Sequence, residues 1–540
     1  MMKPSALFLL IGLLTSTARG EDSPTYEREV KPLLAKRCTV CHNAAKVGQA
    51  DISGGLALDS FEAVLKGTAE HPVIVAGKAD ASVFFKRLID TDEDQRMPLS
   101  DKPLAEAERN LLRRWIDSGA PRGEIPSASA EVKAVTRSKR PPVHTLDVVI
   151  PVAVKASGRP NGLGDGPVRL LLKVGPLPSV TALAFRGDGR ILAVGTHGAV
   201  VLWDLVEGRP AKTLGDVPGP VHALTFSRDG RRLAVGSGLP ARSGSVRVYE
   251  VPGGTLLRDF TGHGDVVFGL AFRPDDAQLA SASFDQTVRL WDLIRGRPAG
   301  VFRGHSDFVY DVVYDRDGKS LLSVSKDRSI KRIDAAKVKE LRTYSEHDDD
   351  VMAIALSGSG GQFVTAGNEP QLRWWSADGE KSTKQVGGHS GPVHQLAFNA
   401  DGSKLISAGG DGSVRIWDGR TGSASKSLPG AADWQYAVSL SADGKRAAAG
   451  GWDGVVHIWD ADAGLLRATL IQPPCDDPAG TEWLAVSSEG FYSASAGMSR
   501  LLRWKAGDRD VQAGDARAAF DRPEALEQAL RGEPLSAPLK

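Results

Sequence analysis

Residues 166–510 repeat with a constant period, and this repeat restricts the possible folds more than any other feature of the sequence. Each unit ends in tryptophan–aspartate or a related pair, and the endings from Trp291 to Trp459 lie 42 residues apart every time. The eight endings are Trp203-Asp204, Tyr249-Glu250, Trp291-Asp292, Ile333-Asp334, Trp375-Ser376, Trp417-Asp418, Trp459-Asp460 and Trp504-Lys505. A period of about 40 to 45 residues indicates a repeat architecture in which neighbouring units stack to complete a core.

Polar residues keep the same register as these endings. The members are His263, His305, His347 and His389, followed by Asp285, Asp327, Glu369, Asp411 and Asp453. This pattern resembles the WD-repeat β-propellers, in which a loop His, a strand Ser or Thr, a turn Asp and a strand Trp form a hydrogen-bonded chain. The resemblance implies two such chains, His263–Ser281–Asp285–Trp291 and His389–Ser407–Asp411–Trp417. Because the residues recur in several blades, we interpret them as structural rather than as acid–base catalysts.

The eight endings favour eight blades. The last ending follows only three expected strands, within 482–504, and the chain then reaches an expected helix at 523–531. Residues 168–174 can supply the missing outer strand, which would close the ring from both chain ends and leave no free edge. Seven blades plus an accessory set of strands is the alternative. Some blades depart from the pattern: Ile333 replaces Trp, Ala431 replaces His, and His197 stands where an Asp would be.

The segment Cys38-Thr39-Val40-Cys41-His42 carries the clearest chemistry in the sequence, because it is the attachment signature of a c-type haem. Each thiol adds to one vinyl group, and His42 is then the proximal iron ligand. A thioredoxin-like pair usually opens a helix after a strand, whereas this pair follows an expected helix at 26–36. A zinc site needs four ligands, and no second Cys or His pair follows in the next hundred residues.

The haem iron needs a sixth ligand, or it stays open for chemistry. Met97 is the only methionine between the haem motif and the linker, and Pro98 stiffens its loop. A thioether ligand raises the reduction potential and suits electron transfer, so we predict that Met97 is the distal ligand. His71 is the alternative ligand, and simple core packing is the alternative role for Met97.

Residues 24–123 resemble the small c-type cytochrome domain found in many exported planctomycete proteins. The resemblance is carried by four segments, Cys38–His42, Gly54–Ser60, Met97-Pro98 and Trp115–Pro121. It departs at Leu99, where the family commonly has a second proline. The resemblance implies one covalently attached haem c, held by Cys38, Cys41, His42 and Met97. Expected helices near 61–65, 82–89 and 104–116 make this domain all-α, with Trp115 and Ile116 turned inward.

The two ends and the linker complete the organisation. Residues 1–20 read as a signal peptide with a positive start, an apolar stretch and a small-x-small cleavage site. After the cytochrome domain we expect a linker at 124–165, with one strand at 148–154, then a propeller at 166–510 and a helical tail at 511–540. Haem attachment takes place outside the cytoplasm in bacteria, so the signal and the haem motif support each other. Cys475 is left over, and we expect it to be a buried, inert thiol.

The sequence thus predicts a multidomain protein, a small all-α cytochrome domain followed by an all-β WD-repeat propeller. We expect an exported, periplasmic or otherwise extracytoplasmic electron carrier, whose propeller docks an unknown redox partner protein. A net charge of +1 gives no support for nucleic-acid binding, and no stretch after the signal is long and apolar enough to cross a membrane. An electron carrier or binding protein is favoured over an enzyme. The alternatives are a propeller-based oxidoreductase with a further cofactor, and an interaction protein with a structural or sensory haem.

Overall fold

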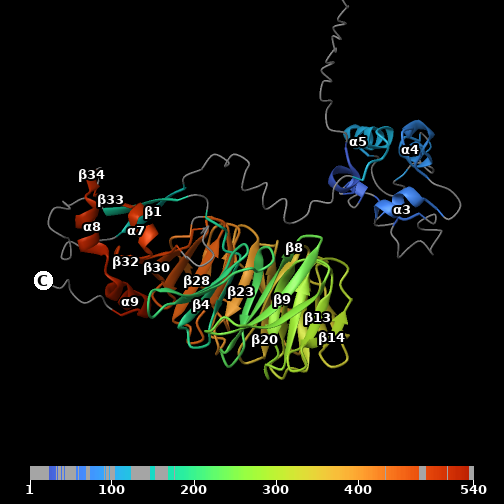
Figure 1. Cartoon of the computed structure of the whole chain (residues 1–540). Coiled ribbons are helices and arrows are strands. Elements are labelled where there is room, and N and C mark those ends of the chain that lie inside the picture. Colours follow the sequence, from blue (N-terminus) through green and yellow to red (C-terminus); the bar gives the residue numbers. More distant parts are fainter. Residues whose placement is uncertain are drawn as a thin grey trace, which may run out of the picture. The chain divides into compact units, whose positions relative to one another are not determined.

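The computed structural model describes residues 24–122, 146–152, 168–174, 177–473, 482–506 and 509–533. Short gaps fall at 32, 35–37, 39–41, 43–55, 59, 69–72, 91, 93–96, 98–103 and 432. The chain divides into two compact units, Met1–Pro141 and Pro142–Lys540. Each unit has its own core, so each is described by itself (Figure 1).

Within the described residues of the first unit, the regular elements are all helices. Its elements are the π-helix η1 (Tyr26–Val30), α3 (Phe61–Lys66), the 3-10 helix η3 (Ala79–Ala81), α4 (Val83–Leu88) and α5 (Glu106–Asp117). The expected helices at 61–65, 82–89 and 104–116 are therefore confirmed to within two residues. The segment expected as one helix at 26–36 begins as η1, and Lys31, Leu33 and Leu34 continue it as α-helix.

The core of this unit lies where the apolar faces of its helices meet. Val30, Leu33 and Leu34 are buried on it, as the helical periodicity predicts. Trp115 and Ile116 are fully buried on the inner face of α5. The indole of Trp115 donates to the carbonyl of Pro121 at 3.0 Å, and the backbone N–H of Tyr26 donates to the same oxygen at 2.9 Å. The start and the end of the domain are therefore held together at one point.

The second unit is built from antiparallel sheets that follow the repeat. The first three are β3 (Ala182–Phe185), β4 (Ile191–Gly195), β5 (Val200–Asp204), β6 (Arg209–Leu214); β7 (Val221–Phe226), β8 (Arg232–Leu239), β9 (Ser243–Glu250), β10 (Leu256–His263); and β11 (Val267–Phe272), β12 (Gln278–Ser283), β13 (Val288–Asp292), β14 (Arg297–Phe302). The next three are β15 (Val309–Tyr314), β16 (Ser320–Ser325), β17 (Ile330–Asp334), β18 (Lys339–Tyr344); β19 (Val351–Leu356), β20 (Gln362–Gly367), β21 (Gln371–Ser376), β22 (Ser382–Gly387); and β23 (Val393–Phe398), β24 (Lys404–Gly409), β25 (Val414–Asp418), β26 (Ala424–Leu428). The seventh sheet has six strands, β27 (Gln435–Leu440), β28 (Arg446–Gly451), β29 (Val455–Asp460), β30 (Leu465–Ile471), β31 (Leu484–Ser487) and β32 (Tyr492–Ala494).

These seven sheets close into a ring. The first strand of each sheet packs against the first strand of the next, and β27 packs back onto β3. At the closure the N–H of Val180 donates to the carbonyl of Gly451 at 2.9 Å. A Cβ on Gly450 would lie 2.6 Å from Cγ1 of Val180, so glycine is what allows the two blades to approach this closely.

An eighth sheet lies outside the ring. It consists of β1 (Leu146–Val152), β2 (Val168–Val174), β33 (Leu502–Ala506) and β34 (Arg509–Val511). The predicted joining of the two chain ends is confirmed, because Leu170 of β2 pairs with Trp504 of β33. Both side chains pack with Val486 and Tyr492 of the extended seventh sheet rather than on the ring axis. The eight endings therefore correspond to eight sheets, of which seven are blades of the ring. This is the alternative prediction of seven blades plus an accessory set of strands, and it replaces the preferred prediction of eight blades.

Three helices follow the last blades, α7 (Ala496–Leu501), α8 (Ala513–Phe520) and α9 (Pro523–Arg531). The helix expected at 523–531 is confirmed with the same bounds. Figure 1 shows α8 and α9 in red beside the last sheets. Leu526 and Leu530 of α9 are buried in the core shared by the first and seventh blades, and Phe520 of α8 stacks on Trp504 at 4.3 Å. The strand β1 lies within the expected linker, two residues earlier than predicted.

Candidate functional site

Cys38 and His42, the two described residues of the haem motif, are joined by a backbone hydrogen bond. The N–H of His42 donates to the carbonyl of Cys38 at 3.0 Å, which places the two side chains one turn apart. The N–H of Cys38 donates to Leu34 at 2.8 Å, so the segment continues from the first helical stretch. The N–H of Leu58 donates to the carbonyl of His42 at 2.8 Å. The motif is thereby fastened on both sides by backbone hydrogen bonds.

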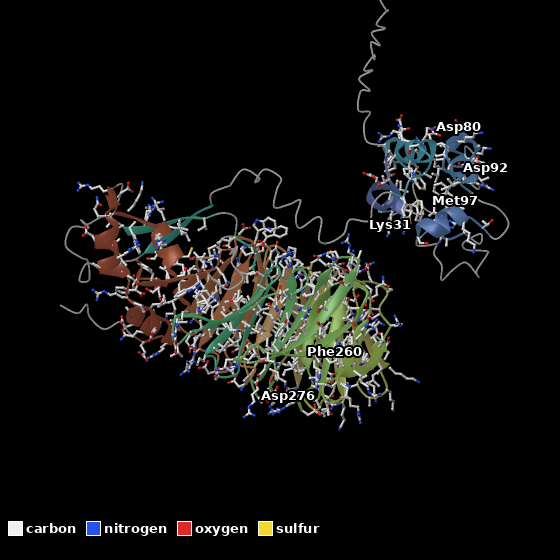
Figure 2. All side chains as sticks on the ribbon, viewed as in Figure 1. Lys31, Asp80, Asp92, Met97, Phe260 and Asp276 are labelled. Atoms are coloured by element: carbon white, nitrogen blue, oxygen red, sulfur yellow. The ribbon has the colours of Figure 1, made fainter. Side chains whose placement is uncertain are left out.

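Met97 reaches the same core from the other half of the domain. Its N–H donates to the carbonyl of Arg87 at 2.8 Å, which ties its loop to the end of α4. Met97, labelled in Figure 2, is partly buried. It packs against the same apolar cluster as the partly buried Cys38, Leu56 and Phe61. A thiol, a neighbouring imidazole and a thioether around an apolar core are the donor set of a c-type haem site. These residues fit the predicted cofactor.

Several predicted residues lie outside the described part of the chain. They are Cys41, the alternative ligand His71, the spare Cys475, Pro98 and the signal segment 1–20. The roles of Cys38, His42 and Met97 as haem ligands and anchors stay predictions. Within the described ranges, no three His, Cys, Asp or Glu side chains are grouped so as to hold a metal ion. Over the same ranges, no helix is long and apolar enough to cross a membrane.

The recurring His and Asp residues of the propeller form the predicted hydrogen-bonded chains. In the blade β23–β26, His389 contacts Asp411 through Nδ1 at 3.1 Å and Ser407 through Nε2 at 2.7 Å, and the indole of Trp417 donates to Ser407 at 2.8 Å. In the blade β11–β14, the corresponding distances are 2.8, 2.7 and 2.8 Å. The serine, aspartate and tryptophan of each chain lie in one blade, and the histidine comes from the segment that leads into it, His263 being the last residue of β10. The histidine and serine side chains are buried, which supports the structural interpretation.

The same chain extends to two further blades, where the sequence varies it. In β19–β22, Glu369 replaces the aspartate and contacts His347 at 2.7 Å, while Trp375 donates to Thr365 at 2.8 Å. In β15–β18, His305 contacts Asp327 at 2.9 Å and Ser323 at 2.7 Å, and the chain ends there because Ile333 has no N–H to donate. In the blade with Ala431, Trp459 donates instead to the carbonyl of Pro429 at 2.7 Å.

Burial and hydrogen bonding set the charges in these chains. Burial lowers the pKa of His263, His347 and His389, although the neighbouring carboxylates partly offset this effect. Burial alone would raise the pKa of Asp285, but hydrogen bonds from His263 and Thr287 hold it well below its usual range. The histidines are therefore neutral and the carboxylates ionised near pH 7.

The structure also brings together residues that the sequence did not single out. A cavity of about 670 Å³ opens at the ring axis, lined from the first strands of the blades. Its lining includes a set of residues spaced 42 apart, namely Phe268, Tyr310, Met352, His394 and Tyr436. Asp311, the next residue after Tyr310, also lines it. His222 also lines the cavity, so that its imidazole, that of His394 and the Asp311 carboxyl group meet there. The aromatic residues in register were a usable signal.

Comparison with known families matches both units. A model described as Planctomycete cytochrome C matches residues 38–101. A model described as WD domain, G-beta repeat matches 171–204, 208–250, 254–292, 296–334, 338–376, 380–418 and 422–460. These seven segments together span about half of the chain, and their number equals that of the ring blades.

Curated relatives match about a fifth of the chain. A WD repeat and HMG-box DNA-binding protein 1 from Xenopus laevis is 31% identical over 106 residues, which is 20% of this chain and 9% of the relative. The protein ROOT INITIATION DEFECTIVE 3 from Arabidopsis thaliana is 33% identical over 123 residues, 22% of this chain and 27% of the relative. Periodic tryptophan protein 2 from Saccharomyces cerevisiae is 31% identical over 118 residues, which is 22% of this chain and 12% of the relative. The chain thus spans no more than 27% of these relatives.

Proposed function

The chain belongs to the WD-repeat family and carries a planctomycete cytochrome c domain, and from this premise we propose that it is an exported haem-binding electron-transfer protein. The cytochrome domain binds one haem c, and the propeller serves as a platform that docks the redox partner. A cytochrome domain and an interaction propeller in one chain support this division of labour. Signal peptide, covalent attachment and electron transfer are parts of the proposal.

One observation carries the haem assignment. Cys38 and Met97 are far apart in the sequence but pack on the same apolar cluster, with His42 one helical turn from Cys38. Small domains rarely gather enough core to be stable alone, and a large apolar group bound between these residues would complete this one. The donors that a haem needs on its two faces come from the two halves of the domain.

The side chains of this domain have separate tasks in the proposal. Cys38 and Cys41 would anchor the porphyrin, and His42 and Met97 would bind its iron. A bound c-type haem supplies a one-electron iron couple, whose potential a thioether ligand raises. The hydrogen bond from Met97 N–H to Arg87 holds the thioether loop, so that little rearrangement is needed between the two oxidation states. The buried side chains of Phe85, Leu112 and Trp115 keep water from the core.

The visible spectrum of the full-length protein, matured with haem-attachment machinery, tests the proposal. We expect a sharp reduced α-band, one haem per chain, and a weak oxidised band of iron–methionine bonding. Met97→Ala should abolish the weak band and lower the reduction potential, since the thioether is lost. Met498→Leu removes a buried thioether from the second unit and should leave the spectrum unchanged.

Other outcomes would redirect the assignment. If His71→Ala, rather than Met97→Ala, changes the axial spectrum, the distal ligand is His71. A five-coordinate spectrum that takes up carbon monoxide would contradict the electron-carrier role and favour an enzyme or sensor. Export is tested separately by sequencing the N-terminus of the mature protein, which should begin at Glu21.

A further inference from the structure

The cavity at the ring axis has an aromatic wall. The rings of His222, Phe268, Phe284 and Phe308 form a continuous stack, with centroids 4.1, 4.0 and 4.3 Å apart along it. Tyr310 meets this stack edge-on, 5.4 Å from Phe284. The stack crosses two blade boundaries, because the rings come from β7, β11, the β12–β13 turn and the loop before β15. Rings stacked in this way cover one another's faces, so the stack forms an apolar wall, and the negative face of a ring is open to a cation only at the two ends of the stack.

The opposite wall is aromatic as well. Tyr436, His394 and Trp452 line the cavity there, and Trp434 lies 6.2 Å from the His394 ring. Trp434 and Trp452 keep 54% and 62% of their surface exposed, although most tryptophans of the propeller are fully buried in blades. Exposed tryptophans at a pocket mouth are typical anchors for a protein partner.

Asp311 supplies a carboxylate among these rings. It accepts backbone N–H bonds from Val312 at 2.8 Å and from Ile354 in the next blade at 3.2 Å. In the described propeller, no Lys or Arg side chain is within ion-pair distance of it, and burial raises the pKa of Asp311 to about 7. At the corresponding position of the blade β23–β26, the neutral Gln395 makes the same kind of contact, to the N–H of Val438 at 2.7 Å. The carboxylate is therefore not required by the blade.

Further carboxylates lie in the loops that lead into the cavity-lining strands. The members of this group are Asp265, Asp307, Asp349 and Asp433. Each stands three residues before one of the cavity-lining residues that are spaced 42 apart. The cavity lining itself contains no Lys or Arg among the residues described. Three histidines line the cavity, and burial lowers the pKa of two of them, His222 to about 4 and His394 in the same direction, so that neither of these two carries a positive charge near neutral pH. Charge at this site thus complements a cation and disfavours an anion.

We propose that this axial pocket binds a lysine or arginine side chain presented by a basic segment of a partner protein. The proposal rests on the docking role proposed above and gives the partner its chemistry. Lys326 already illustrates the contact, since its ammonium group lies 5.0 Å above the Phe308 ring. A volume of about 670 Å³ exceeds one basic side chain, so neighbouring residues of the partner segment enter with it. The tryptophans then cover the apolar stem of the bound side chain.

Fluorescence polarisation with the full-length haem-loaded protein tests this assignment. The probe is a fluorescein-labelled nonapeptide with Lys and Arg at alternate positions, and its control is the same peptide with Gln at those positions. We expect the basic peptide to bind at least about tenfold more tightly than the Gln peptide. Asp311→Asn keeps the shape of the side chain but only one of its two backbone hydrogen bonds, because Val312 and Ile354 donate to different carboxylate oxygens. It should weaken basic-peptide binding about tenfold.

Two matched variants separate the pocket from general surface charge. Gln395→Glu places a second carboxylate in the same register and should strengthen binding. Asp317→Asn removes one charge from the exposed turn beyond the far end of β15 and should leave binding unchanged. Equal effects of Asp311→Asn and Asp317→Asn would overturn the proposal, as would no gain from Gln395→Glu.

The outcomes also distinguish this inference from the function on which it rests. Equal binding of the basic and Gln peptides overturns the cation pocket but leaves docking in place. Binding of neither peptide overturns the cation pocket and counts against the propeller as a peptide-docking platform. The haem assignment is read from the visible spectrum, which none of these propeller variants should alter.

Discussion

The serine at the centre of each His–Ser–Asp–Trp hydrogen-bonded chain contributes a different amount to the free energy of unfolding in different blades. This difference can be measured. A carboxylate can only accept hydrogen bonds, so the Nδ1 of a neutral His389 carries the proton that points to Asp411. The Ser407 hydroxyl therefore donates to Nε2, while its oxygen accepts from Trp417. Ser407→Ala leaves two buried groups without a partner. Ser323→Ala leaves only the Nε2 of His305 without a partner, because that blade has Ile333 instead of tryptophan.

The magnitude follows from the number of partners lost. Each buried polar group left unsatisfied costs about 1–3 kcal/mol of the free energy of unfolding. We therefore expect Ser407→Ala to destabilise the propeller by about 1–2 kcal/mol more than Ser323→Ala. Both serines are fully buried, so the loss of the hydroxyl itself cancels in the comparison.

Urea unfolding of the full chain, followed by tryptophan fluorescence, measures this difference. Ser281→Ala, in the blade with Trp291, should repeat the larger loss. Thr365→Ser keeps the hydroxyl of the blade β19–β22 and serves as a control with a small effect. Equal losses for Ser407→Ala and Ser323→Ala, within about 0.5 kcal/mol, would refute the idea that the indole hydrogen bond stabilises these blades.

Two further predictions concern acid and blade packing. The pKa of His263, His347 and His389 is lower in the folded protein than the ordinary value of 6.5. Below pH 6.5 the unfolded chain therefore binds more protons at these residues than the folded chain does. We expect the free energy of unfolding to fall steadily as the pH drops from 7 to 4. A urea midpoint that is constant or rises over this range would contradict these shifts. Gly450→Ala brings a Cβ against Val180 and should cost about 1–3 kcal/mol of stability in thermal unfolding. Adding Val180→Ala should recover part of the loss, and no recovery would argue against a direct clash.

The sequence predicts the blade interior well because the repeat is local and redundant. Four copies of the His–Asp spacing determine which strands pair and which polar groups are buried. A unit that departs from the pattern, such as the one with Ile333 in place of tryptophan, can be recognised directly in the sequence. The helices of the small unit follow equally from their apolar periodicity, with errors of one or two residues at their ends. The predicted haem site also rests on one short segment, because attachment to a porphyrin requires this spacing of thiols and imidazole.

Other features depend on contacts between residues far apart in the chain. Eight endings cannot distinguish eight blades from seven and an accessory sheet, because each sheet is locally alike. The packing of Val180 against Gly450 decides that β3 meets β27, while the pairing of Leu170 with Trp504 forms a sheet on the outside.

The sequence by itself thus determined the two kinds of domain, the hydrogen-bonded chain within a blade and the candidate haem residues, since each follows from residue spacing along one short segment. Only the tertiary structure decided the number of blades and the composition of the axial pocket. Phe268, Tyr310 and His394 lie 42 residues or more apart and belong to different blades. They become neighbours around Asp311 only because the ring closes, and the closure depends on the summed geometry of all seven blades.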